Sequence, residues 1–104
     1  MRYLDYELDG QTVKRAKTCD FSNLVRGSSN YLALRFALND VWQNMVCAVV
    51  FVIPGQKDEF VPVVNGIASI PDSAAKAKYF IFYVVGQDKN SVRIKTSKEK
   101  LVLE

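Results

Sequence analysis

Apolar and polar side chains alternate with a period of two along most of this chain. From Tyr31 to Leu38 every second residue is a large apolar one, which gives an extended strand one apolar face. Similar short runs are separated by Gly, Pro, Asn and Asp, the residues that favour turns. Further strands are therefore predicted over residues 4–8, 12–18, 46–53, 59–64, 67–70, 79–85, 92–96 and 100–103.

Turn residues predict where neighbouring strands form hairpins. Asp9-Gly10 and Asn65-Gly66 both favour the two-residue turns whose twist suits antiparallel strands. Pro62 has no amide hydrogen to donate, so we expect residues 59–64 at a sheet edge or with a bulge. A helix is predicted only over residues 71–78, and it has two turns at most.

These elements predict an all-β fold, either an antiparallel sandwich or a small barrel. A chain of 104 residues is the size of one domain, so residues 1–104 are expected to form a single β domain. An apolar fraction of 49% and a charged fraction of 24% are typical of globular chains and argue against disorder.

Two predicted strands, 46–53 and 79–85, are apolar on both faces. A two-layer domain has one core, so the outer face of each sheet should be largely polar. If the two strands are neighbours, their outer faces form an apolar patch of several hundred Å². Either the short helix and the loop at residues 19–30 cover this patch, or it contacts another protein.

The residue counts argue against an enzyme. The chain has no histidine, which removes the usual general base and the commonest zinc ligand. Cys19 and Cys47 are too few for a four-cysteine zinc site; they form either one disulfide or two thiols buried on strands. Adjacent Asp58 and Glu59 point to opposite faces of a strand, so they are not an acid–base pair. We predict no catalytic residue, no cofactor and no metal site.

Three carboxylates, Asp5, Glu7 and Asp9, share one strand face. This spacing is compatible with calcium binding, but solvated carboxylates on an exposed strand are the ordinary interpretation. The net charge is +3, and seven basic residues lie between positions 76 and 100 against two acidic ones. An exposed basic strand face accounts for them, and no motif for reading nucleic-acid bases accompanies them, so a nucleic-acid partner is not expected.

The chain is also not expected to enter a membrane or a secretion pathway. Its longest apolar run, residues 46–53, has eight residues, whereas a membrane-spanning helix needs about 20. The first five residues are followed by acidic residues rather than an apolar stretch, unlike a signal peptide. We expect the protein to stay in the compartment where it is made unless it leaves in a particle.

The chain from Tyr31 to Val102 carries a characteristic order of short segments. An alternating strand is followed by a turn with a tryptophan, an apolar strand, a turn with a glycine, and an Ile-Pro pair before the short helical turn. The main segments are Phe36-Ala37-Leu38, Asn39-Asp40-Val41-Trp42, Ala48-Val49-Val50-Phe51, Gly55, Ile70-Pro71, Tyr83-Val84-Val85-Gly86 and Arg93-Ile94-Lys95-Thr96.

This order resembles the small immunoglobulin-like β-sandwich of structural proteins from tailed phages and prophages of Gram-positive bacteria. Members of that group typically have Trp-Asp-Gly after the alternating strand, where this chain has Trp42-Gln43-Asn44. The resemblance implies an antiparallel immunoglobulin-like β-sandwich of about seven to nine short strands with one short helical turn.

The resemblance further implies a non-enzymatic virion structural protein, assembled in the host cytoplasm. We expect a head decoration protein that docks on other virion proteins, such as the major capsid protein, if Met1 and Glu104 are natural ends. If the chain is an excised fragment, a baseplate or fibre attachment domain is expected instead. A homo-oligomer is also expected, for which a trimer is one candidate.

The predicted interface combines the two-faced strands with the basic segment that follows. Basic side chains would complement an acidic partner, and residues 97–104 could add a strand to a partner sheet. If this face is an interface, Phe82→Glu should abolish docking without unfolding. The predicted interface residues are Val50, Val52, Phe80, Phe82, Val84, Arg93, Lys95, Lys98 and Lys100.

Trp42 has two interpretations. It follows a turn and precedes an apolar strand, where a large aromatic side chain typically closes one end of a sandwich. Alternatively, it is exposed and binds a host saccharide with the polar residues around it. Those residues are Asn39, Asp40, Gln43 and Asn44. A small nucleic-acid-binding or inhibitor protein of phage origin is a third function class.

Overall fold

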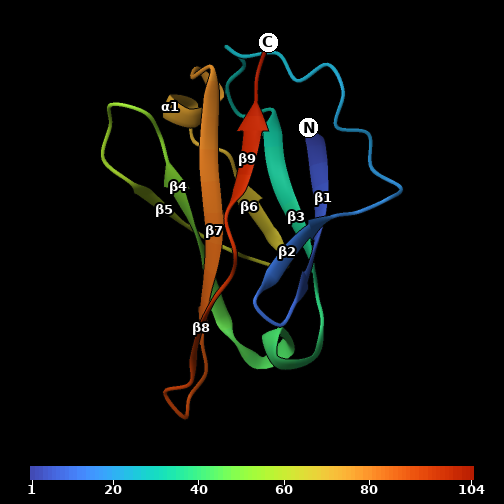
Figure 1. Ribbon diagram of the computed structural model, residues 1–104, viewed down its shortest axis with the longest axis vertical. Coiled ribbons are helices and arrows are strands. Elements are labelled where there is room, and N and C mark those ends of the chain that lie inside the picture. The colour runs from blue at the N-terminus through green and yellow to red at the C-terminus, as the bar shows by residue number, and fades with distance from the viewer.

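Two β-sheets pack face to face in the computed structural model, which describes residues 1–104 apart from the side chain of Asp40 (Figure 1). The four-stranded sheet has the order β2-β1-β3-β6, and its strands are β1 (Arg2–Asp9), β2 (Thr12–Arg15), β3 (Leu32–Leu38) and β6 (Ile67–Ser69). The five-stranded sheet consists of β4 (Val46–Val52), β5 (Glu59–Pro62), β7 (Tyr79–Gln87), β8 (Arg93–Lys95) and β9 (Glu99–Val102).

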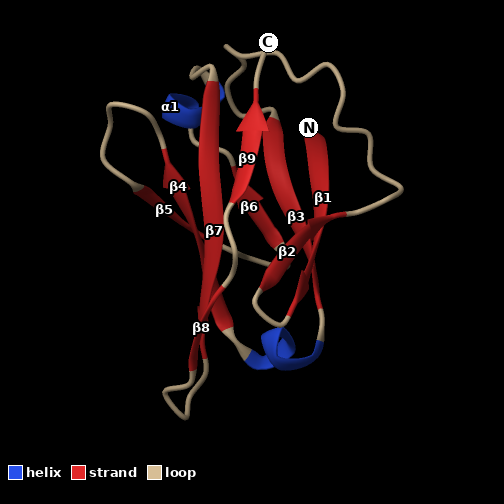
Figure 2. Ribbon diagram, in the orientation of Figure 1, coloured by secondary structure: helices blue, strands red, loops and turns tan.

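The five-stranded sheet has the order β5-β4-β7, and β8 and β9 pair with successive parts of β7. Two short helical segments, η1 (Asp40–Asn44) and α1 (Asp72–Ala75), complete the fold (Figure 2). The prediction of an all-β sandwich is therefore confirmed.

Each predicted strand is present, with differences at the boundaries. The predicted strand 12–18 stops at Arg15, where the chain turns. The predicted helix 71–78 is a single turn, because Lys78 already accepts a hydrogen bond from the Leu103 amide at the start of the β7–β9 pairing. The 3-10 helix η1 lies where the sequence analysis predicted only a turn.

The predicted β1–β2 hairpin and the edge prediction for Pro62 are confirmed. At Asn65-Gly66 the predicted turn forms, bridged by Val64 and Ile67, but the predicted hairpin is wrong because β5 pairs with β4 and β6 pairs with β3 in the other sheet. Asn65 and Gly66 have φ angles of 53° and 77°, the positive values that a two-residue hairpin turn of this kind requires. β5 is an edge strand of its sheet. The Val63 amide donates to the Cys47 carbonyl, so the backbone nitrogen of Pro62, one residue earlier, faces away from β4.

One strand pair departs from the antiparallel prediction. β1 and β3 are parallel, with Arg2 opposite Leu32 and Leu8 opposite Leu38. A parallel pair needs a long crossover, and here β2 and the loop at residues 16–31 supply it. The alternation of side chains is the same in parallel and antiparallel strands, so the sequence pattern contained no signal for this pairing.

Aromatic side chains from both sheets meet in the core between them. The rings of Tyr6 on β1 and Phe82 on β7 pack edge to face with centroids 5.1 Å apart, and those of Phe51 and Phe80 pack similarly at 5.6 Å. Such edge-to-face pairs add to the free energy gained from burying apolar area. The inner faces of β1, β3, β4 and β7 therefore supply the centre of the core, to which α1, β9 and the connecting loops add further buried side chains.

Trp42 closes one end of the sandwich, as one of its two interpretations predicted. Its side chain is 0% exposed, and its indole N–H donates to the Gly10 carbonyl at 2.7 Å. Gly86 on β7 makes room for the ring: a Cβ atom at this position would lie 2.6 Å from Cζ3 of Trp42 and 2.9 Å from Sδ of Met45.

A polar triad joins the two sheets along one side. The Glu99 carboxylate on β9 accepts a hydrogen bond from the Tyr6 hydroxyl at 3.0 Å and forms an ion pair with Arg15 at 2.6 Å. Burial raises the pKa of the Tyr6 hydroxyl well above its ordinary value, and the nearby charge of Glu99 raises it further. Tyr6 thus remains a protonated donor within the core.

We predict that Gly86→Ala lowers the free energy of unfolding by about 1–3 kcal/mol, because the new methyl group overpacks the site against the Trp42 ring. Denaturant unfolding measures the change. In a Trp42→Phe background, which lacks the contacting ring atoms, the additional cost of Gly86→Ala should fall. An equal cost in both backgrounds would contradict this packing account.

The stability of the protein should decline above about pH 10, the ordinary pKa of tyrosine. The raised pKa of Tyr6 keeps its proton in the folded chain, whereas the unfolded chain releases it, so stability is full below that pH and is lost as pH rises. Tyr6→Phe should flatten this decline by about 1 kcal/mol per pH unit. Tyr31→Phe, at a half-exposed ring, is the control, and an unchanged slope in Tyr6→Phe would refute the expectation.

Candidate functional site

The outer face of the five-stranded sheet is the candidate site, because its apolar side chains point away from the core. Four of its large apolar side chains are exposed, including Val46 (84%) and Phe60 (68%). The pairing registers place the following residues on this outer face: Val46, Ala48, Val50, Val52, Phe60, Pro62, Tyr79, Ile81, Tyr83, Val85, Gln87, Arg93, Lys95, Lys100 and Val102.

The helix and loop that were considered as a cover lie elsewhere. Ala74 and Ala75 of α1 are buried in the core, and Leu24 of the loop at residues 19–30 is buried as well. Phe21 of this loop packs its ring against Tyr6 at 5.3 Å, on the side of the polar triad. In the part of the chain that the structure describes, the outer face therefore has no cover.

The structure divides the predicted apolar interface residues between the two faces. Val50 and Val52 belong to the outer face, although Val50 is buried between its cross-strand neighbours Phe60 and Tyr83. The prediction was wrong for Phe80, Phe82 and Val84. Their side chains are 0% exposed and point into the core.

Val46, Phe60 and the outward residues of β7 were not among the predicted interface residues. One signal was present in residues 79–85, where the two tyrosines and the two phenylalanines occupy opposite faces. A tyrosine carries a hydroxyl group that favours a position with access to water, so Tyr79 and Tyr83 were the better candidates for the outer face. The outward residues of β7 are Tyr79, Ile81, Tyr83 and Val85.

Basic side chains border this apolar face on the side of β8 and β9. The ammonium group of Lys95 lies 4.6 Å from the ring centre of Tyr83, and that of Lys100 lies 4.5 Å from the ring centre of Tyr79. Arg93 is exposed opposite Gln87, and Lys98 is exposed between β8 and β9. The four predicted basic residues therefore lie along one border of the site.

The outer face of the four-stranded sheet has a different chemical character. Arg35 and Asp5 form an ion pair across it at 2.6 Å, and the Arg35 guanidinium covers the ring of Tyr3 at 4.4 Å. Glu7 is exposed on the same face. Polar side chains on one outer face and apolar ones on the other distinguish the five-stranded sheet as the candidate contact surface.

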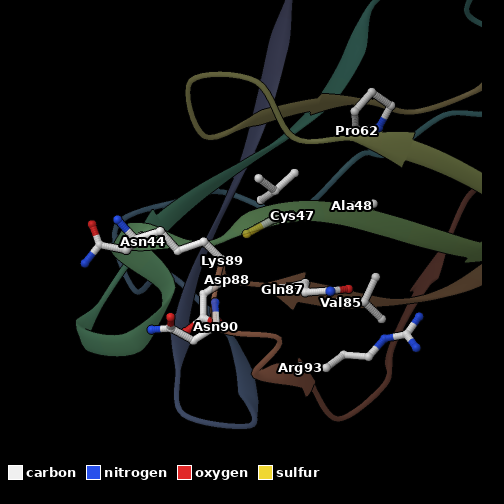
Figure 3. Close-up of a pocket in the computed structure, with 12 residues that line it drawn as sticks. Asn44, Cys47, Ala48, Pro62, Val85, Gln87, Asp88, Lys89, Asn90 and Arg93 are labelled. Carbon is white, nitrogen blue, oxygen red and sulfur yellow. The ribbon is translucent and has the colours of Figure 1, made fainter.

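A hollow of about 1010 Å³ lies at one end of the outer face (Figure 3). Apolar side chains from β4, β5 and β7 line it, together with Asn44 at the end of η1 and polar residues of the β7–β8 hairpin. Figure 3 shows Arg93 and Lys89 extending in different directions from this hairpin. The lining residues are Asn44, Val46, Cys47, Ala48, Pro62, Val85, Gly86, Gln87, Asp88, Lys89, Asn90 and Arg93.

The saccharide-binding interpretation of Trp42 is wrong. A sugar ring stacks on an exposed aromatic face, whereas Trp42 is completely buried and its N–H is already bonded to Gly10. Asn39 is half-buried, Gln43 and Asn44 are exposed beside it, and the side chain of Asp40 lies outside the described residues.

The C-terminal segment is not a free strand that awaits a partner. Within residues 97–104, β9 pairs with β7, and Leu101 and Leu103 are buried. The Glu104 amide also donates to the Leu24 carbonyl at 2.7 Å. The segment therefore completes its own sheet, and its addition to a partner sheet stays a prediction for the edge of β9 that does not pair with β7.

The two cysteines are both free thiols. Cys47 is buried on β4, where burial raises the pKa of its thiol, whereas Cys19 is half-buried in a turn rather than on a strand. Among the described residues, no group of His, Cys, Asp and Glu side chains is arranged to hold a metal ion, and Asp5 is instead paired with Arg35. None of the described helices has the length and apolar character needed to cross a membrane.

Comparisons of this chain with protein-family models, with curated proteins and with solved structures each found no match. The outer face, its basic border and its hollow are the features of this chain that bear on function.

We predict that Phe82→Glu prevents folding, because a carboxylate at this fully buried position would cost several kcal/mol without a partner. Phe60→Glu, on the exposed edge strand, should change the free energy of unfolding by about 1 kcal/mol or less. Circular dichroism and denaturant unfolding test both variants. A folded Phe82→Glu protein would show that the assignment of faces on β7 is incorrect.

Proposed function

We propose that this protein is a non-enzymatic structural component of a tailed-phage virion, a head decoration protein that docks on other virion proteins through the outer face. The observation that carries the docking role is the uncovered apolar surface of the five-stranded sheet. The resemblance of residues 31–102 to the β-sandwich of phage structural proteins supports the virion role.

The outer face has the composition of a protein interface. Aromatic side chains are enriched in such interfaces, and here Phe60, Tyr79 and Tyr83 lie among aliphatic residues of β4 and β7. Burying apolar area contributes about 25 cal/mol per Å² before the costs of association are subtracted. Exposed Val46, Phe60 and Val102 would provide much of that area.

The basic residues along the border indicate that the partner surface is acidic. Lys95 and Lys100 lie over tyrosine rings, which limits their freedom before binding and reduces the entropy lost on contact. The same arrangement disfavours single-stranded nucleic acid, because bases bind by stacking on free aromatic faces. An apolar protein surface with acidic residues along one side is the partner that fits best.

Two alternative functions would use the same face. A baseplate or fibre attachment domain would dock on a tail protein instead of the capsid. Alternatively, sister subunits in a homo-oligomer would cover part of the face, with a trimer as one form. Under both alternatives the protein is assembled in the host cytoplasm and is located in the virion.

Particles made by the phage or prophage that encodes this chain should contain it at a fixed number of copies per particle. The double variant Val46→Glu/Phe60→Glu should reduce its incorporation by more than about tenfold, because each carboxylate would be desolvated without a partner. Thr12→Glu adds the same group at an exposed position of β2 and is the matched control. Quantitative mass spectrometry of purified particles measures incorporation.

Several outcomes distinguish the head decoration role from the two alternative functions. Protein in tail-less heads supports the decoration role, whereas protein only in isolated tails supports the attachment role. Light scattering over a concentration series shows whether copies of the chain associate, and whether the double variant prevents it. Purified particles that lack the protein would refute the virion role.

A further inference from the structure

The hollow at the end of the outer face differs from the rest of that face because it is concave. Val46 and Ala48 on β4, Pro62 on β5 and Val85 on β7 supply its apolar lining. Ala48 lies directly between Pro62 and Val85 in the pairing register. Its small side chain leaves this part of the face lower than the neighbouring row, where Val50 lies between Phe60 and Tyr83.

The charged groups around the hollow are mainly basic. Lys89 and Arg93 line it, and Lys95 lies opposite Val85. Asp88 is the one carboxylate among the lining residues, and its Oδ1 atom accepts hydrogen bonds from the amides of Asn90 and Val92, both at 2.9 Å. Asp88 therefore shapes the hairpin, and three basic groups against one acid leave a local net charge of +2.

Amide side chains complete the polar border. Asn44 lies at the end of η1, Gln87 lies on β7 opposite Arg93, and Asn90 is at the tip of the β7–β8 hairpin. Primary amides can donate to a carboxylate or to a peptide carbonyl. The border can thus bind the backbone and acidic groups of a segment whose apolar side chain enters the hollow.

We propose that this hollow is an anchor pocket for one large apolar side chain of an acidic partner segment. Carboxylates next to that side chain would pair with Lys89 and Arg93, while the apolar group contacts Val46, Ala48 and Val85. A second copy of this chain fits less well, because its outer face carries the same basic border and its one lining carboxylate, Asp88, is already bonded within its own hairpin. The inference rests on the proposed docking role of the outer face and names the chemistry of the partner.

Short peptides test the inference without a known partner. The probes are N-acetylated, C-amidated tripeptides: Asp-Phe-Asp, its charge-reversed form Lys-Phe-Lys, and Asp-Ser-Asp, which lacks the apolar anchor. We expect Asp-Phe-Asp to shift the amide NMR signals of Val46, Ala48 and Val85, with a Kd on the order of 1 mM for so small a contact. Lys-Phe-Lys and Asp-Ser-Asp should bind at least about threefold more weakly.

Two variants separate the apolar and charged contributions. Ala48→Tyr fills the hollow with a side chain that favours strands and should abolish the shifts. The double variant Lys89→Gln/Arg93→Gln should weaken Asp-Phe-Asp binding by about threefold or more, since two exposed ion pairs are lost. Lys14→Gln, at an exposed basic residue of β2, should have no effect.

Several results would overturn the inference: no shift with Asp-Phe-Asp, shifts confined to other parts of the chain, equal binding of Lys-Phe-Lys, or full binding by a folded Ala48→Tyr variant. Association of copies through the hollow would appear as a concentration-dependent mass that Ala48→Tyr removes, and would also overturn it. If the peptides fail but particle incorporation still requires the outer face, only the anchor pocket is lost. If Asp-Phe-Asp binds but particles lack the protein, the pocket stands and the virion role fails.

Discussion

The structure depends on the constraint that a two-layer sandwich has only one core. The strand β7 is apolar on both faces, so burying Phe80, Phe82 and Val84 necessarily directs the alternate side chains outward. The neighbouring strand β4 has the same property, and its register with β7 aligns the two outward rows. The apolar outer face is therefore a direct result of packing two such strands side by side.

Contacts between the two sheets, on the side opposite the outer face, stabilise this arrangement. Trp42 closes one end, and the triad of Tyr6, Arg15 and Glu99 joins the sheets along one side. Because these contacts lie on the inner face or at its border, the outer face can change or bind without disturbing the core. Its curvature and charge follow from a few positions, such as the small Ala48 and the lysines over the tyrosine rings.

Much of the fold could be predicted because its signals are local. Alternation marked the strands, Asn65-Gly66 marked a two-residue turn, and the missing amide hydrogen of Pro62 marked an edge. The parallel pairing of β1 with β3 could not be predicted, since it depends on where a long loop returns the chain. The candidate site was predicted only in part, because apolarity alone does not decide which side of residues 79–85 faces the core.

The position of Pro62 has a consequence for how the protein behaves at high concentration. Edge strands can pair with one another and extend a sheet from molecule to molecule without limit. Here the Pro62 nitrogen, one of the backbone nitrogens that face outward from β5, carries no hydrogen, so an incoming strand would lose a ladder bond at this position. Open-ended polymerisation from this edge is therefore disfavoured, although the apolar outer face beside it remains exposed.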